Sequence, residues 1–286
     1  MTGAAGMLGL DVLRAGERTE HELVGLARTE LDIVDAGAVE AAFARVKPQA
    51  VINCAAWTDV DAAEGERELA RAVNADGARN LAMAAAWERV PVVHVSTDYV
   101  FKGEAFVDAS TGAPRAYVES DPTGPRTAYG QTKLEGEREV LAASPRHTVV
   151  RSAWLFGVGG RNFAETMLRL AGEREAVQVV TDQVGCPTWT GHLAPALIGL
   201  LDRGVAGLVH LAGAGHVSWN GFAKEIFRQA EVDCRVEDAT SEQMARPAPR
   251  PAWSALESER ADVIPLPPWQ DGLAGYLAAR AGVVRA

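Results

Sequence analysis

The stretch AYGQTKLEGE places Tyr129 and Lys133 four residues apart. In a helix this spacing puts two side chains on one face, one turn apart, so a phenol and an ammonium would project together. A neighbouring cation favours the phenolate and lowers the phenol pKa from its usual value of about 10, which makes the tyrosine a usable general acid. The pair therefore predicts proton transfer by Tyr129, tuned by Lys133. A Tyr-x-x-x-Lys pair is common, and an amphipathic surface helix is the alternative interpretation.

Two hydroxyl residues, Ser96 and Thr97, end the apolar stretch VPVVHVST at 90–97. Ligands of doubly wound parallel sheets bind outside the carboxyl ends of the strands. A hydroxyl at that place can hydrogen-bond the same carbonyl group that Tyr129 would protonate. The two motifs together predict one site for a carbonyl substrate.

A third motif opens the chain, where TGAAGMLG carries Gly3, Gly6 and Gly9 ahead of a helical apolar pattern. Glycines let the backbone approach a pyrophosphate, and the helix that follows directs its N–H groups and positive dipole end at the charge. The small residues Ala55 and Ala56 follow another strand candidate and would let a flat ring or a ribose lie against the backbone. These features predict a dinucleotide site. Isolated turn glycines and ordinary strand-end packing are the alternatives.

The elements that must position these motifs alternate between short apolar runs and longer helical patterns. Strands are predicted at 21–27, 50–56, 90–97 and 148–156, and helices at 36–46, 61–87 and 127–143. Near-continuous apolar runs are typical of strands buried on both faces, and the alternation indicates a parallel sheet covered by helices. We predict an α/β fold with a Rossmann-like doubly wound sheet, and an NAD(P)-binding domain over residues 1–152.

After this region the alternation of strands and helices loosens. We predict helices at 162–172, 190–203 and 219–230 and strands at 177–182 and 207–213. Ser218 is the expected N-cap of the helix at 219–230, which has the strongest apolar periodicity. Proline-rich segments at 246–253 and 265–269 indicate irregular chain. Residues 153–286 are expected to form mainly a smaller substrate-binding lobe, with segments within about 176–213 returning to the Rossmann domain.

Composition excludes several classes of function. The chain has 286 residues and a formal net charge of −10, which argues against a nucleic-acid partner because such a surface must be basic. Cys54, Cys186 and Cys234 lie far apart, so they indicate neither a disulfide framework nor a zinc site. No secretory leader and no apolar run of about 18 residues is present, so we expect a cytoplasmic protein without a membrane partner.

Taken in order along the chain, the motifs resemble those of the extended short-chain dehydrogenase/reductases, and within them the dTDP-4-dehydrorhamnose reductase family. The similar stretches include TGAAGMLG, VINCAAWTDVDAAE, VSTDYVF, YGQTKLEGE, RSAWLFG, NFAETMLRLA, TDQVGCPT and RPAPRPAWSAL. They cover nearly the whole chain. The stretches STDYVF and DQVGCPT are the ones that separate this family from the sugar epimerases.

The resemblance implies an NADPH-dependent oxidoreductase with Thr97, Tyr129 and Lys133 as its catalytic set. A hydride would pass from the nicotinamide to the C4 ketone of a dTDP-4-keto-6-deoxyhexose, with dTDP-4-dehydro-L-rhamnose as the expected substrate and dTDP-L-rhamnose as the product. Tyr129 would protonate the nascent alkoxide, and Lys133 would hold the ribose while it tunes the phenol.

The resemblance also implies two sets of binding residues. The cofactor set is Gly3, Gly6, Met7, Leu8, Arg28, Asp32, Ile33, Ala55, Ala56, Thr58, Ser96, Tyr129 and Lys133. The substrate set is Thr97, Asp98, Tyr99, Trp154, Asn162, Arg250 and, in a second role, Thr58. A place in the core is the alternative for Trp154.

Single residues indicate which nicotinamide cofactor the protein binds and whether it holds a metal ion. Arg28 follows the strand predicted at 21–27, where it could reach a ribose 2′-phosphate, so we expect NADP, with NAD as the alternative. Some family members dimerise around Mg²⁺ held by three carboxylates. Asp11 matches the first, but Gly191 and Pro268 stand where the others are expected, so we expect no metal. Both a monomer and a homodimer stay open.

The start of the chain departs from the family, because only Met1 and Thr2 precede the glycine motif where about five apolar residues would form the first strand. Without that central strand its two neighbours would keep unpaired ladder groups, at about 1–3 kcal/mol for each buried orphan. We therefore expect the first strand to be missing from this sequence and the natural protein to begin several residues upstream.

Two other functions compete with this prediction. The first is a related dTDP-4-ketohexose reductase that makes an antibiotic-type or other deoxysugar. The second is a non-catalytic nucleotide-binding homologue that regulates another protein. The complete set of Thr97, Tyr129 and Lys133 favours an enzyme over that homologue.

Overall fold

The computed structural model describes residues 1–284. Its centre is a parallel sheet of β1 (Val51–Asn53), β2 (Val92–Thr97), β5 (Thr148–Ser152) and β10 (Gly207–His210), in the order β1-β2-β5-β10. Nearly every residue of the first three strands is buried, as their apolar sequences require.

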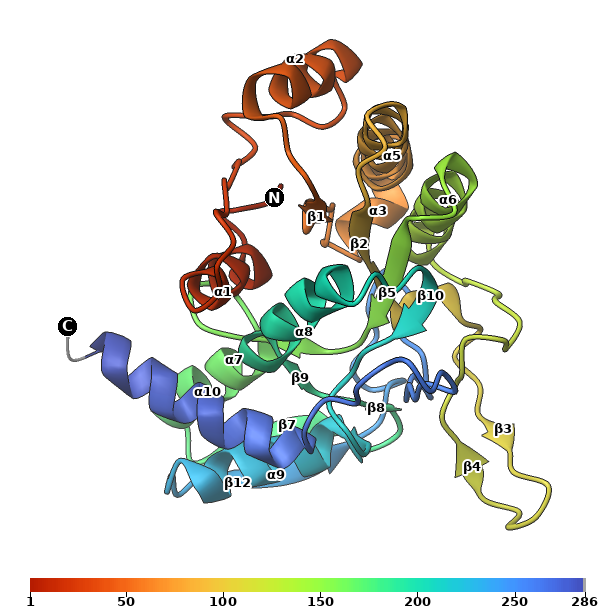
Figure 1. The fold of residues 1–286 in the computed structure, drawn as a ribbon. Coiled ribbons are helices and arrows are strands. Elements are labelled where there is room, and N and C mark those ends of the chain that lie inside the picture. The colour runs from red at the N-terminus through yellow and green to blue at the C-terminus, as the bar shows by residue number, and fades with distance from the viewer. Residues whose placement is uncertain (285–286) are drawn as a thin grey trace.

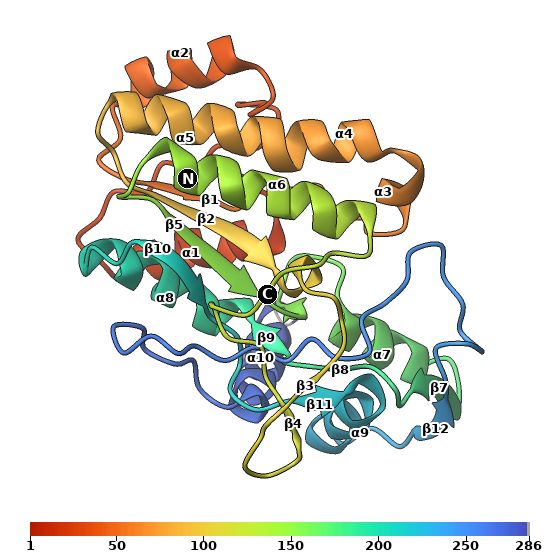
Figure 2. The same ribbon diagram turned by 90° about the vertical axis from the view of Figure 1, so that its right-hand side faces the viewer.

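Helices cover both faces of this sheet (Figures 1 and 2). One layer contains α5 (Ala78–Trp87) and α6 (Ala128–Ala143), and the other contains α1 (Met7–Gly16) and α8 (Thr190–Asp202). The predicted α/β architecture with helices on both faces of a parallel sheet is confirmed.

The strand predicted at 21–27 is wrong. Only Leu26 pairs, through a single parallel bridge to Thr2, and Thr2 also bridges to Asn53 at the end of β1. Thr2 thus takes the central position expected of the first strand. Met1 extends it, because its amino group donates to the Val24 carbonyl at 2.7 Å and its carbonyl accepts from the Leu26 N–H at 2.9 Å. Among the described residues, no continuous ladder forms along 21–25.

Several predicted helices match the structure closely. α2 spans Ala36–Val46 with Asp35 as its N-cap, and α6 begins after Thr127, whose hydroxyl accepts from the Gly130 N–H at 3.0 Å. The helix predicted at 61–87 is interrupted. It consists of α3 (Ala62–Gly65), α4 (Arg67–Arg71), a π-helical turn η1 (Ala72–Gly77) and α5.

A smaller lobe lies below the sheet in Figure 2 and has its own core. It contains α7 (Phe163–Ala171), β7 (Ala176–Val180), α9 (Trp219–Gln229), β12 (Arg235–Ala239) and α10 (Trp269–Val284). Ser218 caps α9 as predicted, with its hydroxyl accepting from the Gly221 N–H at 3.0 Å. β12 pairs in parallel with β7, and α10 packs on α9. Both β12 and α10 were absent from the prediction.

Short strand pairs connect the lobe to the sheet. They are β6 (Leu155–Phe156) with β9 (Thr188–Trp189), and β8 (Val184–Gly185) with β11 (Val217–Ser218). A hairpin of β3 (Phe106–Val107) and β4 (Pro114–Arg115) extends from the body of the molecule (Figure 1). The single strand predicted at 148–156 is divided in the structure into two strands, β5 and β6. Within the described 284 residues, no helix is both long and apolar enough to cross a membrane.

Candidate active site

The end of β2 turns directly into a short 3-10 helix η2 (Asp98–Val100), and this turn gathers three predicted site residues. The Thr97 hydroxyl donates to Asp98 Oδ1 at 3.0 Å and accepts from the Tyr99 N–H at 3.2 Å. Thr97 and Asp98 are buried, and Tyr99 is half-buried. The local hydrogen bonds fix this turn at the carboxyl end of the sheet.

Helix α6 brings Tyr129 to the same turn. Gly130 makes this approach possible, since a Cβ there would lie 2.2 Å from the Tyr99 carbonyl oxygen. The rings of Tyr99 and Tyr129 meet edge to face with centroids 5.5 Å apart. Thr97 and Asp98 lie close enough to the Tyr129 hydroxyl to influence its ionisation. The structure thus brings Thr97, Asp98, Tyr99 and Tyr129 together.

The expected effect of the lysine on the phenol is wrong for this arrangement. Burial raises the pKa of Tyr129 to about 12, and the nearby Thr97 hydroxyl only partly opposes the shift. The Lys133 amino group does not counter the burial, because its Nζ donates to the Val95 carbonyl at 2.7 Å and lies 3.3 Å from His94 Nε2. Tyr129 is therefore held as a protonated phenol, the form a proton donor needs.

Lys133 lies one turn deeper along α6 and is buried with only 2% of its surface exposed. Burial lowers the pKa of Lys133 to about 8, and Glu137 and Cys54 partly oppose that shift. A lysine with this pKa changes charge within the range in which enzymes work.

The glycine motif forms a tight turn against the end of β1. Gly3 has a φ of +70°, and a Cβ on it would lie 2.7 Å from the backbone of Cys54 and Ala55. A Cβ on Gly9 would lie 2.2 Å from the Gly3 carbonyl oxygen. Gly6 is the N-cap of α1 and donates its N–H to that same carbonyl at 3.0 Å. Side chains are thus excluded from a turn that faces a helix N-terminus, which fits close approach of a pyrophosphate.

The other predicted cofactor residues differ in their exposure. Met7 and Leu8 open α1, and Ala55 and Ala56 are half-buried beyond β1. Arg28, Asp32 and Thr58 are exposed.

Two members of the predicted cofactor set direct their side chains inward. Ile33 is buried against Gly77, where a Cβ would lie 2.6 Å from it. The Ser96 hydroxyl donates to buried Glu137 at 2.6 Å, so it is engaged beneath α6.

The predicted substrate residue Trp154 has a strained backbone and a stacked ring. Its φ is +47°, and its indole stacks on Trp219 with centroids 3.4 Å apart and planes 3° apart. A Cβ on Gly185 would lie 2.4 Å from the indole, which explains the glycine in DQVGCPT. A non-glycine residue at positive φ is held there by its surroundings, and such residues concentrate at functional sites.

The side chain of Asn162 is fully used by the local fold. Its Oδ1 caps α7 by accepting from the Glu165 N–H at 2.9 Å, and its Nδ2 donates to the carbonyls of Gly157 and Gly160 at 2.8 and 3.2 Å. The structure therefore does not bring its polar atoms to the group around Tyr129.

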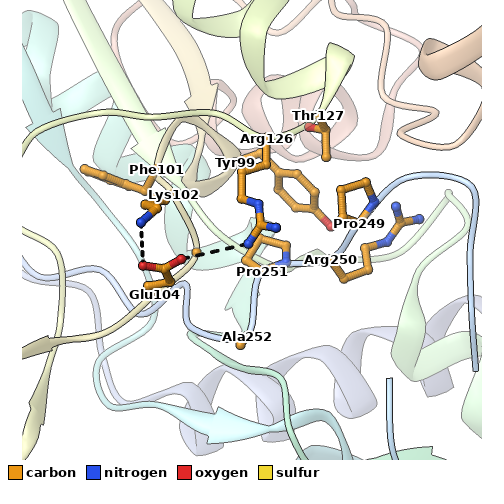
Figure 3. A pocket seen from close by; sticks show the side chains of 11 residues that line it. Tyr99, Phe101, Lys102, Glu104, Arg126, Thr127, Pro249, Arg250, Pro251 and Ala252 are labelled. Carbon is orange, nitrogen blue, oxygen red and sulfur yellow. Dashed lines mark ion pairs between the residues drawn. The ribbon is translucent and has the colours of Figure 1, made fainter. Parts of the chain in front are cut away.

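Arg250 belongs to a proline-rich segment that crosses to the sheet domain. Its Nη2 donates to Asp61 Oδ2 at 2.8 Å, and the Ala248 N–H donates to Asp61 Oδ1 at 3.2 Å. Arg250 and Tyr99 line a cavity of about 200 Å³, and the Tyr99 ring reaches toward the segment at Pro249 and Arg250 (Figure 3). The remaining lining residues are Phe101, Lys102, Gly103, Glu104, Arg126, Thr127, Pro249, Pro251 and Ala252.

One acceptor beside the tyrosine has no partner. Among the described residues, Asp98 Oδ2 is buried without a hydrogen bond, and so is the Ser152 hydroxyl. Burial raises the pKa of Asp98 to about 6. An unpaired buried acceptor in a native structure requires an explanation, and a bound ligand with hydroxyl groups supplies one.

Asp11, the first carboxylate of the family's metal set, is already engaged. It accepts hydrogen bonds from Thr190 and Arg14, the latter at 2.9 Å. Residues 1–284 contain no group of three His, Cys, Asp or Glu side chains placed to hold a metal ion.

Sequence reasoning missed several residues that structure the site. His94 and Asn53 are polar residues within otherwise apolar buried strands, and that contrast was the available signal. Trp219 was predicted only as the first residue of the helix at 219–230, and its stacking on Trp154 was not foreseen. Asp61 gave no signal, because its partner Arg250 is 189 residues away.

Fold and site together define a Rossmann-like α/β protein with a tyrosine and a lysine at the carboxyl edge of its sheet. The family model described as RmlD substrate binding domain matches residues 1–281. The chain belongs to this family.

Its relatives confirm the predicted resemblance. A Streptomyces griseus protein named dTDP-4-dehydrorhamnose reductase is 44% identical over 292 residues, covering 99% of this chain and 93% of the relative. A Streptomyces antibioticus protein named probable dTDP-4,6-dihydroxy-2-methyloxan-3-one 4-ketoreductase is 42% identical, with coverage of 96% and 92%. The fold is also similar to the crystal structure of the Bacillus anthracis dTDP-4-dehydrorhamnose reductase in complex with NADP, with a TM-score of 0.92. The two sequences are 34% identical, and 97% of each chain is covered.

Proposed function

We propose that this protein reduces the C4 ketone of a dTDP-4-keto-6-deoxyhexose with NADPH, converting dTDP-4-dehydro-L-rhamnose to dTDP-L-rhamnose in the cytoplasm. The observation that carries the proposal is the placing of Tyr129 against Thr97 at the end of β2, in a chain whose 44%-identical relative bears that reductase's name. Such a site combines a proton donor with a hydroxyl that can orient a carbonyl.

NADPH, when bound, supplies the hydride for C4. The glycine turn and the N-terminus of α1 fit its pyrophosphate, and exposed Arg28 suits the 2′-phosphate. Residues 1–152 form the cofactor domain in this proposal, and residues 153–286 form mainly the substrate lobe.

The chain's own residues handle the proton and the sugar. Tyr129 donates its phenolic proton to the ketone oxygen as that oxygen gains charge, and the high pKa of the phenol ensures that the proton is present at neutral pH. Thr97 orients the same oxygen by hydrogen bonding. Asp98 Oδ2 accepts from a sugar hydroxyl, which satisfies the unpaired oxygen. Trp154 and Arg250 contact the rest of the nucleotide sugar.

The test is incubation with dTDP-4-keto-6-deoxy-L-lyxo-hexulose and either NADPH or NADH, followed at the reduced-nicotinamide absorbance band. We expect turnover with preference for NADPH, and NMR of the product should show dTDP-L-rhamnose. Absence of signal loss with both cofactors would overturn the proposal.

A related ketoreductase is the second candidate, because the 42%-identical relative carries the name of a 4-ketoreductase for a different deoxysugar. The two candidates share Thr97, Tyr129 and Lys133 and differ in the sugar face presented to the cofactor. Product NMR separates them by the configuration at C4.

A further inference from the structure

A continuous chain of hydrogen bonds connects Lys133 to the end of β1. Lys133 Nζ lies 3.3 Å from His94 Nε2, and His94 Nδ1 lies 2.9 Å from Asn53 Nδ2. Asn53 Oδ1 accepts from the Ala55 N–H at 3.0 Å and from the Thr2 hydroxyl at 2.7 Å. Lys133, His94 and Asn53 are each buried with 1–2% of their surface exposed.

The direction of every bond in this chain is determined by one backbone donor. The Ala55 N–H can only donate, so the atom of Asn53 that faces it must be the oxygen. The amide NH₂ of Asn53 therefore faces His94 Nδ1, which must accept. A neutral imidazole that accepts at Nδ1 carries its proton on Nε2, and that N–H points at Lys133.

An ammonium has no lone pair, so a protonated Lys133 would set a donor against the His94 N–H. A neutral amine accepts from His94 and still donates to the Val95 carbonyl at 2.7 Å. We propose that His94 is a positioning residue that stabilises the amine form of Lys133, by donating its Nε2–H to Nζ, and so lowers the upper limit of the pH range in which the lysine is a cation.

The other groups around Lys133 agree with this assignment. Cys54 and Glu137 are the further titratable groups that act on it, and both favour its cationic form. Glu137 is committed elsewhere, since it forms a buried ion pair with Arg151 at 2.7 Å. His94 is disfavoured as a cation by burial and by Lys133, so the two residues share at most one extra proton.

The inference rests on the proposed function, in which Lys133 acts beside Tyr129, but its main test needs neither cofactor nor sugar. The chain has four lysines, and the other three, Lys47, Lys102 and Lys224, are exposed. In protein labelled with ¹³C-lysine, we expect the Lys133 signal to titrate near pH 8, well below the ordinary lysine value of about 10.4. The ¹⁵N spectrum of His94 should show a proton on Nε2 and none on Nδ1.

The variant Asn53→Asp reverses the direction of the chain by replacing a donor with an acceptor. His94 should then carry its proton on Nδ1 and accept from Lys133, so the lysine midpoint should rise by about one unit or more. The high-pH limb of kcat/KM should move by the same amount.

His147→Gln is the matched control. His147 is also buried and also accepts at Nδ1 while its Nε2 faces a carbonyl, but its partners are Val92 and Ala82. This variant should leave the Lys133 midpoint unchanged.

Titration of Lys133 together with the exposed lysines, or a His94 proton on Nδ1 in the unsubstituted protein, would overturn the inference. These outcomes do not depend on ketone reduction, so an inactive protein with the expected titration would refute only the proposed function.

Discussion

Two buried polar clusters lie on successive turns of α6, and they differ in how fully their groups are paired. Glu137 forms two hydrogen bonds with Arg151, at 2.7 and 2.9 Å, and accepts a third from Ser96. Among residues 1–284, Lys133, one turn earlier, has no carboxylate partner, and it contacts His94 instead. Asp98, which follows β2 and acts on Tyr129, has an Oδ2 without a hydrogen bond among the described residues.

The difference separates a structural cluster from a functional one. A buried pair with all its hydrogen bonds fixes the packing of α6 on β2 and β5, and its charges do not need to change. Groups that are buried and incompletely paired are unfavourable for stability, but they can gain or lose protons and accept a ligand's hydrogen bonds. The partly satisfied cluster lies beside Tyr129, where the proposed chemistry occurs.

The largest expected loss of stability follows from breaking the paired cluster. Glu137→Gln leaves Arg151 as an uncompensated buried cation and should lower the free energy of unfolding by about 3–5 kcal/mol. Urea unfolding measures this. Glu173→Gln, which removes an exposed pair with Arg169 on α7, is the control and should cost less than about 0.5 kcal/mol. Equal effects of the two variants would contradict the structural role assigned to Glu137.

A gain in the free energy of unfolding is expected when the incompletely hydrogen-bonded Asp98 is replaced. Asp98 has a folded-state pKa of about 6, above its usual 3.8, so the folded state binds the extra proton between these values. Stability therefore falls as pH rises from about 4 to 6, and Asp98→Asn should recover up to about 3 kcal/mol at pH 7.5 but little at pH 4. Urea unfolding at the two pH values measures the difference.

Asp121 is the control for the direction in which stability changes with pH. Hydrogen bonds from Arg115 lower the pKa of its carboxyl, so its contribution is present at neutral pH and is lost as pH falls. Asp121→Asn should destabilise the protein at pH 7.5. If both variants changed stability in the same direction, the distinction between fully and partly hydrogen-bonded carboxylates would fail.

Smaller effects are expected when two glycines in helices, Gly199 and Gly9, are replaced by alanine. Gly199 in α8 has open space where a Cβ would lie, so Gly199→Ala should stabilise the protein by about 0.5–1 kcal/mol. A Cβ on Gly9 in α1 would lie 2.2 Å from the Gly3 carbonyl oxygen, so Gly9→Ala should displace the glycine turn and weaken NADPH binding. Thermal unfolding and NADPH fluorescence titration measure the two effects. Unchanged NADPH binding in Gly9→Ala would contradict the role given to the turn.

Sequence patterns predicted those elements whose cause is local. The strand at 90–97 and the helices at 36–46 and 127–143 agree with β2, α2 and α6, because apolar periodicity and caps such as Thr127 define them. The strand at 21–27 failed because its apolar sequence forms a ladder only when a neighbouring strand supplies partners. α10 was missed because its start, Trp269, follows three prolines within the preceding four residues.

Prediction of the site was limited in the same way, to features with a local cause in the sequence. Four residues of the group around Tyr129 follow from motifs, because each motif lies at the end of a predictable element. The direction of the Tyr129 pKa did not follow, since it depends on burial and on the side chain of Lys133 turning to His94 and Val95. The contact of Asp61 with Arg250 joins distant segments and has no local signature.

The most direct test of the central claim is the rate of NADPH oxidation by Tyr129→Phe with the dTDP-4-keto sugar, alongside NADPH binding. Removal of the phenolic proton should lower kcat by about 10²–10⁴-fold and leave cofactor affinity unchanged. Turnover equal to that of the unsubstituted protein would contradict the assignment of Tyr129 as the proton donor.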